Sequence, residues 1–265
     1  MTAETSWVES MPEIYDRCLG SAIFAPYAGD LAMRAVALHP RRVLELAAGT
    51  GIVTAGLVEA LPNAEITATD LNDPMVGYAA ARVPGPVWQQ ADAMDTGFAD
   101  ESFDLVVCQF GVMFFPDRVG GYREVRRVLQ PGGAFLFSAW DSIETCDLEN
   151  AFYEALAVVF PEDPPTFAAR VPHGYADPDR IRADVQAAGL RVEDVERVVL
   201  RGRAPSAAAI AEGFCLGTPN RFDLLERGDL AEATKRVAAV LTERLGTGPV
   251  DGELAAYVVT ARKHA

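Results

Sequence analysis

The sequence is poor in the residues that metal, disulfide or membrane chemistry needs. Its four cysteines lie far apart with no C-x-x-C spacing, so neither a zinc site nor a disulfide framework is indicated. No apolar run approaches the roughly 20 residues of a membrane-spanning helix. The N-terminus has no basic stretch followed by an apolar run. We therefore expect no metal, reduced thiols, and a soluble cytoplasmic protein that does not insert into a membrane.

Positive charge is also scarce. The chain has 23 Lys and Arg against 38 Asp and Glu, which gives a formal net charge of −15. Such a surface repels the phosphates of nucleic acid. Half of the residues are hydrophobic and only 23% are charged, which excludes a disordered chain. We expect a folded protein that acts on a small molecule and not on nucleic acid, with a homodimer as an open alternative to a monomer.

Short apolar runs alternate with helical patterns from Arg41 onward. This alternation is typical of parallel strands joined by crossover helices, and it predicts a doubly wound α/β domain. The expected strands are 42–46, 65–70, 87–90, 105–110 and 134–139. The expected helices are 51–61, 73–82 and 120–129, and a turn at 131–133 ends the last of them.

After Trp140 the alternation breaks, which indicates inserted segments within a single domain. Helical patterns cover 148–160, 177–188 and most of 206–246, and apolar strand patterns cover 190–203 and 254–261. The predicted parts of the domain 1–265 are a helical cap (1–40), a cofactor-binding core (41–145), helical lid or substrate insertions (146–188 and 204–250) and two last core strands (189–203 and 251–263).

The first expected strand runs into the turn Ala47 Ala48 Gly49 Thr50 Gly51, which opens a helix. Glycine allows the positive φ values of such a turn, and the free N–H groups at a helix start bind anions. A methionine carboxylate and a pyrophosphate would both fit. Two features favour the former. The pattern Gly49-x-Gly51-x-x-Thr54 lacks the third glycine of dinucleotide-binding turns. In addition, the Glu45 carboxylate would repel a pyrophosphate but attract the ammonium group of a methionine moiety.

Two further acidic residues follow strands. Asp70 ends the second strand, where a carboxylate can accept hydrogen bonds from both ribose hydroxyls. Its alternative role is a helix cap, which Asp73 suits better. Asp92 follows the third strand and either binds an adenine amino group or stabilises its own loop; both interpretations stay open.

Taken together, these residues resemble the motifs of class I S-adenosylmethionine-dependent methyltransferases, especially the small-molecule group that includes the ubiquinone and menaquinone C-methyltransferases. The resemblance spans Arg41 to Trp140 and comprises five ordered motifs, at 43–51, 68–71, 91–93, 98–106 and 125–133. It implies S-adenosylmethionine as cofactor. It also implies a Rossmann-like sheet of seven strands, mostly parallel, with the last strand antiparallel.

The resemblance also implies the cofactor site, residue by residue. The residues around the methionine part would be Glu45, Ala47, Gly49, Thr50 and Gly51, with Gln109 facing the amine. The residues at ribose and adenine would be Asp70, Leu71, Asp92 and Ala93. Ala47 and Ala48 replace a glycine that is common at the start of this turn, which narrows the room there.

The methyl acceptor is less well defined, because methyl transfer needs mainly an in-line approach and the exclusion of water. The acceptor atom can be oxygen, nitrogen or carbon. The candidate pocket residues are Tyr15, Phe110, Phe114, Phe115, Trp140 and Phe214, each of which can equally serve core packing. His173 is the candidate general base; the alternative is a loop histidine with no proton-transfer role.

Methyl transfer to a small molecule is therefore the leading hypothesis. An NAD(P)-dependent oxidoreductase would share the fold and Asp70, but Glu45 speaks against it. A non-catalytic adenosylmethionine-binding partner protein is the other alternative, which the intact motifs disfavour.

Overall fold

The computed structural model describes residues 10–264, so residues 1–9 of the expected helical cap lie outside the described part. The chain divides into two compact units. Unit 1 comprises Met1–Pro26, Asp141–Gly174 and Val199–Ala255, and unit 2 comprises Tyr27–Trp140, Tyr175–Val198 and Ala256–Ala265.

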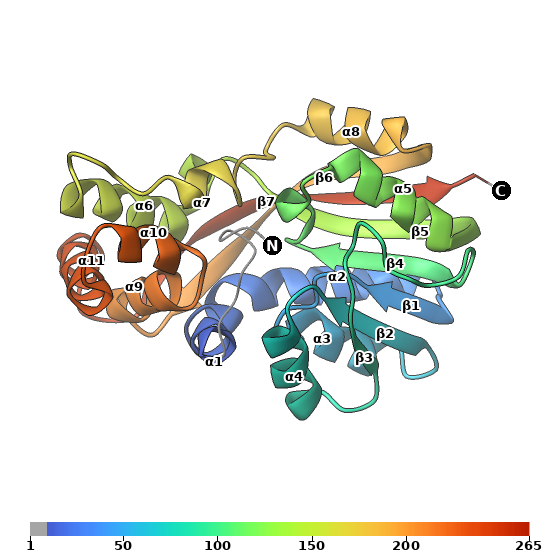
Figure 1. Ribbon diagram of the computed structural model, residues 1–265, viewed down its shortest axis with the longest axis horizontal. Coiled ribbons are helices and arrows are strands. Elements are labelled where there is room, and N and C mark those ends of the chain that lie inside the picture. Colours follow the sequence, from blue (N-terminus) through green and yellow to red (C-terminus); the bar gives the residue numbers. More distant parts are fainter. Residues whose placement is uncertain (1–9, 265) are drawn as a thin grey trace. The chain divides into compact units, whose positions relative to one another are not determined.

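Seven strands form one sheet in the order β3-β2-β1-β4-β5-β7-β6 (Figure 1). They are β1 (Arg42–Glu45), β2 (Glu65–Asp70), β3 (Val87–Gln90), β4 (Phe103–Gln109), β5 (Leu129–Trp140), β6 (Leu190–Ala204) and β7 (Val250–Lys263). The first five are parallel to their neighbours, and β7 runs antiparallel to β5. The expected Rossmann-like sheet with an antiparallel last strand is thereby confirmed.

Helices cover both faces of the sheet within unit 2. They are α2 (Ala25–Ala37), α3 (Ile52–Ala60), α4 (Asp73–Arg82), α5 (Arg118–Val128) and α8 (Pro178–Ala187). Figure 1 shows α5 and α8 on one face and α2 and α3 on the other. A Cβ added to Gly56 of α3 would stand 3.4 Å from the Cβ of Ala32, so these two helices pack closely through small residues. On the opposite face Tyr122 of α5 packs on the β5 rings Phe135 and Phe137.

Two boundaries differ from the sequence expectation for identifiable reasons. Helix α5 begins at Arg118 and not at residue 120, because Asp117 caps it by accepting a hydrogen bond from the Gly120 N–H at 2.9 Å. The segment expected as a turn before β5 lies inside that strand. Pairing with β4 starts at Leu129, breaks in register and resumes at Ala134, and Gly132 has a φ of 77°. The glycines therefore make an irregularity within a longer strand.

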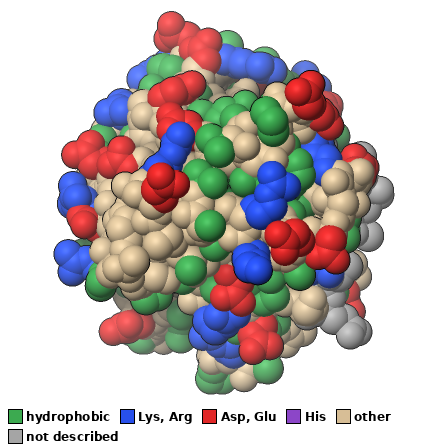
Figure 2. Space-filling view, turned by 90° about the vertical axis from the view of Figure 1, so that its left-hand side faces the viewer, with side chains coloured by type: hydrophobic (Ala, Val, Ile, Leu, Met, Phe, Trp, Pro, Cys, Tyr) green, Lys and Arg blue, Asp and Glu red, His purple; other side chains and the backbone are tan. Residues whose placement is uncertain are grey.

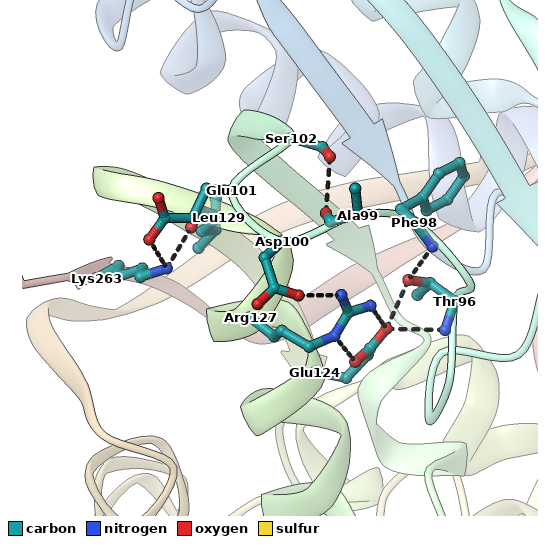
Figure 3. A network of polar contacts seen from close by, with 10 residues as sticks. All are labelled: Thr96, Phe98, Ala99, Asp100, Glu101, Ser102, Glu124, Arg127, Leu129 and Lys263. Atoms are coloured by element: carbon teal, nitrogen blue, oxygen red, sulfur yellow. Dashed lines mark hydrogen bonds and ion pairs between the residues drawn. The ribbon is translucent and has the colours of Figure 1, made fainter.

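The loop after β3 is tied to α5 by a buried carboxylate, Glu124 (Figure 3). Its oxygens accept hydrogen bonds from the backbone N–H (2.9 Å) and hydroxyl (2.6 Å) of Thr96 and from Nε (2.8 Å) and Nη2 (2.7 Å) of Arg127. Burial alone would raise the pKa of Glu124, but these bonds outweigh it and lower the pKa to about 2. Arg127 also pairs with Asp100 at 2.6 Å.

Unit 1 is mainly helical. It contains α1 (Met11–Tyr15), a π-helix (Asp16–Phe24), α6 (Asp147–Val159), α7 (Phe167–Arg170), α9 (Ala207–Leu216), α10 (Asn220–Glu226) and α11 (Leu230–Leu245). A Cβ on Gly213 of α9 would stand 2.7 Å from the Leu19 side chain, so this glycine lets α9 lie directly against the π-helix. Figure 2 views the left-hand side of Figure 1, where α6 and α11 lie, and acidic and basic side chains are interspersed there with hydrophobic ones.

Residues 10–264 contain neither a helix that could cross a membrane nor a cluster of metal-ligating side chains. None of the helices is both long and apolar enough to cross a bilayer. In the same part of the chain, no three His, Cys, Asp or Glu side chains are grouped so that they could hold a metal ion.

Candidate functional site

Three of the predicted site residues end neighbouring parallel strands of unit 2. Glu45, Asp70 and Gln109 are the last residues of β1, β2 and β4, and β1 lies between the other two strands. Their carboxyl ends therefore meet at one edge of the sheet, on either side of the point where the chain reverses its direction of winding. Open α/β sheets bind their ligands at this position.

The turn after β1 has a left-handed backbone at three residues: Ala47 (φ 53°), Gly49 (φ 56°) and Gly51 (φ 83°). At Gly51 a Cβ would stand 3.1 Å from the Trp88 ring, which favours glycine there. At Gly49 a Cβ would meet nothing within 4 Å. The turn thus leaves open space beside Gly49.

Gly111 completes this turn, although it was not among the predicted site residues. A Cβ there would stand 2.5 Å from the Ala47 Cβ and 2.7 Å from the Cys108 Sγ. Only glycine lets the segment after β4 lie against the turn after β1. The preceding Phe110 has a φ of 51°, which is unusual for a large side chain. The sequence signal that could have identified Gly111 is its position directly after the apolar pattern of β4.

Glu45 is a buried carboxyl group without a cationic partner among residues 10–264. Its exposed fraction is 1%, and its Oε2 accepts a hydrogen bond from the Thr54 hydroxyl at 2.6 Å. Burial raises the pKa of Glu45 to about 8, the Thr54 bond lowers it, and the nearby charge of Asp70 raises it. The carboxyl is therefore largely protonated at neutral pH until a cation comes close.

Asp70 accepts hydrogen bonds from the backbone on both sides of its carboxylate. Its Oδ2 accepts from the Gly49 N–H at 2.9 Å, and its Oδ1 accepts from the Asn72 N–H at 2.9 Å. Burial raises the pKa of Asp70, while these hydrogen bonds lower it. The cap position of α4 belongs to Asn72 and not to Asp73, which is already helical. Asn72 Nδ2 also donates to Oδ1 at 3.2 Å, so of the about four acceptor positions of a carboxylate the remaining one is on Oδ2.

The residues expected at adenine lie on the loops after β2 and β3. Leu71 is half-buried, and its carbonyl accepts from Gln90 Nε2 at 2.9 Å. Asp92 is exposed, and its Oδ1 accepts from the Met94 N–H at 2.8 Å. Asp92 therefore stabilises its own loop, as one interpretation expected, and its second oxygen is left for other donors. Ala93 is half-buried in the same loop.

Two predicted pocket residues of unit 2 form an aromatic cluster at the ends of β4 and β5. Phe110 and Trp140 stack with ring centroids 3.6 Å apart. Tyr27, which lies in the segment expected as the helical cap (1–40), meets both rings edge-on at 5.2 and 5.4 Å. Its hydroxyl donates to the Val198 carbonyl at 2.9 Å. The cluster is buried and gives this end of the sheet an apolar, aromatic character.

The other predicted aromatic residues have different surroundings. Phe115 is buried and packs against Tyr122, which is the core role, while Phe114 is half-buried. In unit 1, Tyr15 stacks on Phe24 at 4.7 Å, and Phe214 stacks on Phe152 at 4.8 Å.

His173 lies in unit 1, and its exposed fraction is 7%. Its Nδ1 is 2.7 Å from the Asp141 carbonyl oxygen. Because a carbonyl can only accept, Nδ1 carries the proton and Nε2 the lone pair. Burial lowers the pKa of His173 to about 4, although the Asp141 bond opposes this. The imidazole is therefore neutral and a weak base.

The turn after β1 fits a ligand that carries a cation and a polar anionic group. Glu45 has no cationic partner among the described residues, and the space beside Gly49 is open. The Thr50 hydroxyl is buried and has no hydrogen-bond partner. An amino-acid moiety satisfies these groups, since its ammonium pairs with a carboxylate and its carboxylate accepts hydrogen bonds.

Comparisons with known proteins agree with this geometry. Residues 44–137 match the methyltransferase domain family. The chain is 29% identical to malonyl-[acyl-carrier protein] O-methyltransferase of Halorhodospira halophila over 71% of this chain and 79% of that protein. It is 34% identical to demethylmenaquinone methyltransferase of Deinococcus radiodurans over 46% of this chain and 52% of that protein, so it spans about half of this relative.

The fold is also that of solved methyltransferases. Phosphoethanolamine N-methyltransferase 2 of Haemonchus contortus, in complex with S-adenosyl-L-methionine, superposes with a TM-score of 0.60 at 13% identity, over 100% of this chain and 60% of that one. Fold, motifs and relatives define a class I methyltransferase with a Rossmann-like sheet. The chain is an S-adenosylmethionine-dependent methyltransferase that resembles the quinone methyltransferases. The oxidoreductase and non-catalytic alternatives are not favoured.

Proposed function

We propose that the chain transfers a methyl group in line from S-adenosylmethionine to an oxygen, nitrogen or carbon atom of a small molecule. The observation that carries the proposal is the buried Glu45 carboxyl, which lacks a cationic partner among the described residues and ends β1 beside a left-handed glycine turn. S-adenosylmethionine supplies the methyl group and, in its methionine ammonium, the missing cation.

The proposed binding roles follow from the strand ends. Glu45 and Gln109 bind the methionine amine, and the turn 47–51 binds the carboxylate through its N–H groups and the Thr50 hydroxyl. Asp70 accepts hydrogen bonds from the ribose hydroxyls, with Leu71 beside it. Asp92 and the backbone of Ala93 bind the adenine edge.

The proposed acceptor is a small apolar or aromatic molecule. Its proposed contacts are the predicted pocket residues, Tyr15, Phe110, Phe114, Phe115, Trp140 and Phe214. The net charge of −15 supports a small molecule over nucleic acid. A homodimer and a cytoplasmic location stay predictions.

His173 is the proposed general base for an oxygen or nitrogen acceptor. Its Nδ1 donates to the Asp141 carbonyl, which fixes the tautomer in which Nε2 carries the lone pair. With a pKa of about 4, it would be neutral from about pH 5 upward. We therefore expect its ionisation to add no pH dependence to kcat in this range, and His173→Ala to lower kcat without changing cofactor affinity.

Calorimetry tests the cofactor assignment. We expect S-adenosylmethionine and its demethylated product to bind and NAD not to bind. Asp70→Ala should weaken both sulfur ligands by about 1–3 kcal/mol, the usual cost of losing hydrogen bonds to a charged acceptor. Binding of NAD alone would contradict the proposal, and an unchanged affinity in Asp70→Ala would remove that residue from the site.

A further inference from the structure

Unit 1 contains a buried carboxyl oxygen without a partner among the described residues. Glu149 lies in the first turn of α6, and its exposed fraction is 5%. Its Oε2 has no hydrogen-bond partner, and no Lys, Arg or His among residues 10–264 forms an ion pair with it. A buried polar group without a partner is costly and rare in folded proteins. Glu149 therefore calls for a ligand that supplies a donor.

The surroundings of Glu149 on its helix are apolar and aromatic. The neighbouring Leu148 and the Phe152 one turn later each have an exposed fraction of 1%. Residues three apart share one side of a helix, so Phe152 lies next to the carboxyl, and it stacks on Phe214 of α9 at 4.8 Å. The position at the start of α6 favours the ionised form, because the helix dipole is positive there.

A second buried acceptor of unit 1 is also unpaired. The Thr218 hydroxyl donates to the Phe214 carbonyl at 2.6 Å. Its oxygen must therefore accept from Asn220 Nδ2, which is 2.9 Å away. This fixes the orientation of the Asn220 amide and makes Oδ1 the unpaired atom. Both unpaired buried side-chain atoms found in the described part of unit 1 are thus acceptors, which matches a ligand rich in N–H or O–H groups.

We propose that Glu149 binds the ammonium group of an arylalkylamine acceptor whose ring contacts the Phe152–Phe214 pair, and that Asn220 accepts a further hydrogen bond from this ligand. The proposal rests on the methyl-transfer function proposed above and names its acceptor class. An ammonium group neutralises the carboxylate and supplies three donors, whereas a hydroxyl supplies one.

The ionisation of Glu149 is consistent with this role. Burial raises its pKa to about 7, the bond from its own backbone N–H lowers it, and the charge of Asp147 raises it. The carboxyl thus changes its charge near neutrality, and a bound ammonium group would keep it ionised.

Probe binding to the full chain tests the proposal. Three probes share one apolar body: phenethylamine, phenethyl alcohol and hydrocinnamate. We expect the amine to bind most tightly, and Glu149→Gln to weaken it at least tenfold while the alcohol changes less than about threefold. The control Glu144→Gln removes an exposed carboxylate from the same segment and should change neither. The proposal is overturned if the carboxylate probe binds best, if no probe binds, or if the amine binds Glu149→Gln normally.

S-adenosylhomocysteine is titrated in parallel, so that the two proposals fail separately. A chain that does not bind it contradicts the cofactor assignment, while the amine result still decides the role of Glu149. Stability gives a second measurement. Because the folded pKa of Glu149 lies above the unfolded value, its ionisation destabilises the ligand-free protein at pH 8. Glu149→Gln should therefore raise the melting midpoint by about 3 °C or more. A lower midpoint would show a structural partner and overturn the proposal.

Discussion

Glu124 and Glu45 are both buried carboxyl groups of unit 2, yet their pKa values are shifted in opposite directions from the ordinary value of a glutamate. Glu124 accepts bonds from Arg127 and Thr96, which overcome burial and lower its pKa to about 2. Glu45 accepts one hydroxyl bond, from Thr54, and burial raises its pKa to about 8. One carboxylate is neutralised by the chain itself, and the other lacks a cation among the described residues.

This is the difference we expect between a carboxylate with a structural role and one that binds a ligand. A charge that is paired within the chain contributes to folding and has little left for a ligand. A buried charge without a partner costs folding free energy, and a bound cation recovers that cost. Substitutions at the two positions should therefore have opposite effects on stability and on cofactor affinity.

The largest effect is expected at Glu124. Glu124→Gln removes the main partner of Arg127 and weakens the contact with Thr96. Because Arg127 is about one third exposed, we expect a loss of about 2–3 kcal/mol in the free energy of unfolding, which is less than the roughly 3–5 kcal/mol of a fully buried pair that loses one partner. The folded pKa is depressed, so this stabilisation is present above about pH 4.5 and is lost as the pH falls toward 2.

Denaturant titration of Glu124→Gln at pH 7 and pH 3 measures this loss, which should be smaller at pH 3. Asp100→Asn is the matched control, since Asp100 contacts the same arginine but its side chain is 75% exposed. It should cost less than about 0.5 kcal/mol. Equal losses in the two variants would show that Arg127, and not the buried carboxylate, carries the stability.

Glu45→Gln should have the opposite effect. We expect S-adenosylmethionine to bind roughly 10- to 100-fold more weakly, as for the loss of a charge-assisted bond of about 1.5–3 kcal/mol. Because the folded pKa is raised, ionisation of Glu45 destabilises the ligand-free protein as the pH rises from about 4.5 toward 8. The variant should therefore be at least as stable as the native chain at pH 8. A Glu45→Gln variant with native affinity and lower stability would show that Glu45, like Glu124, has a structural role.

The protonation of Glu45 also predicts proton release on binding. Below pH 8 the free carboxyl is mostly protonated, and pairing with the ligand ammonium ionises it. Binding at about pH 6.5 should therefore release about one proton, and affinity should rise toward pH 8. It should then fall as the ligand amine, with a pKa of about 7.7–8.0, loses its own proton. Calorimetry in buffers of different ionisation enthalpy measures the release, which Glu45→Gln should abolish.

The sequence allowed Glu45 to be predicted but not Glu124, and the reason is local. Glu45 belongs to a strand, turn and helix start that are adjacent in sequence, so the motif alone predicts that its carboxylate lies at a strand end beside the turn. Glu124 and Arg127 are three residues apart on a helix and look like a surface ion pair. Their burial comes from the loop that carries Thr96, 28 residues away, and no short pattern encodes that contact.

Other features that depend on contacts between distant segments could not be predicted from the sequence either. The strands could be predicted because apolar periodicity is local, whereas the irregularity at Gly132 depends on pairing with β4. The depressed pKa of His173 depends on burial within unit 1. Glu149 looks like an ordinary acidic residue at a helix start, and only its burial reveals an unpaired oxygen.

The smallest effect should come from the two threonines at the turn. Their hydroxyls are neutral, and again one has a partner within the chain and the other has none among the described residues. The Thr54 hydroxyl donates to Glu45, while the buried Thr50 hydroxyl has no partner. Thr54→Val should therefore cost about 1 kcal/mol of stability, and Thr50→Val should cost nothing or stabilise the ligand-free protein slightly. Thr50→Val should instead weaken S-adenosylmethionine binding about two- to fivefold, as expected for one neutral hydrogen bond. Thermal unfolding and calorimetry measure both. A Thr50→Val protein with native affinity would remove this hydroxyl from the cofactor site, and the turn would then bind the carboxylate through its backbone alone.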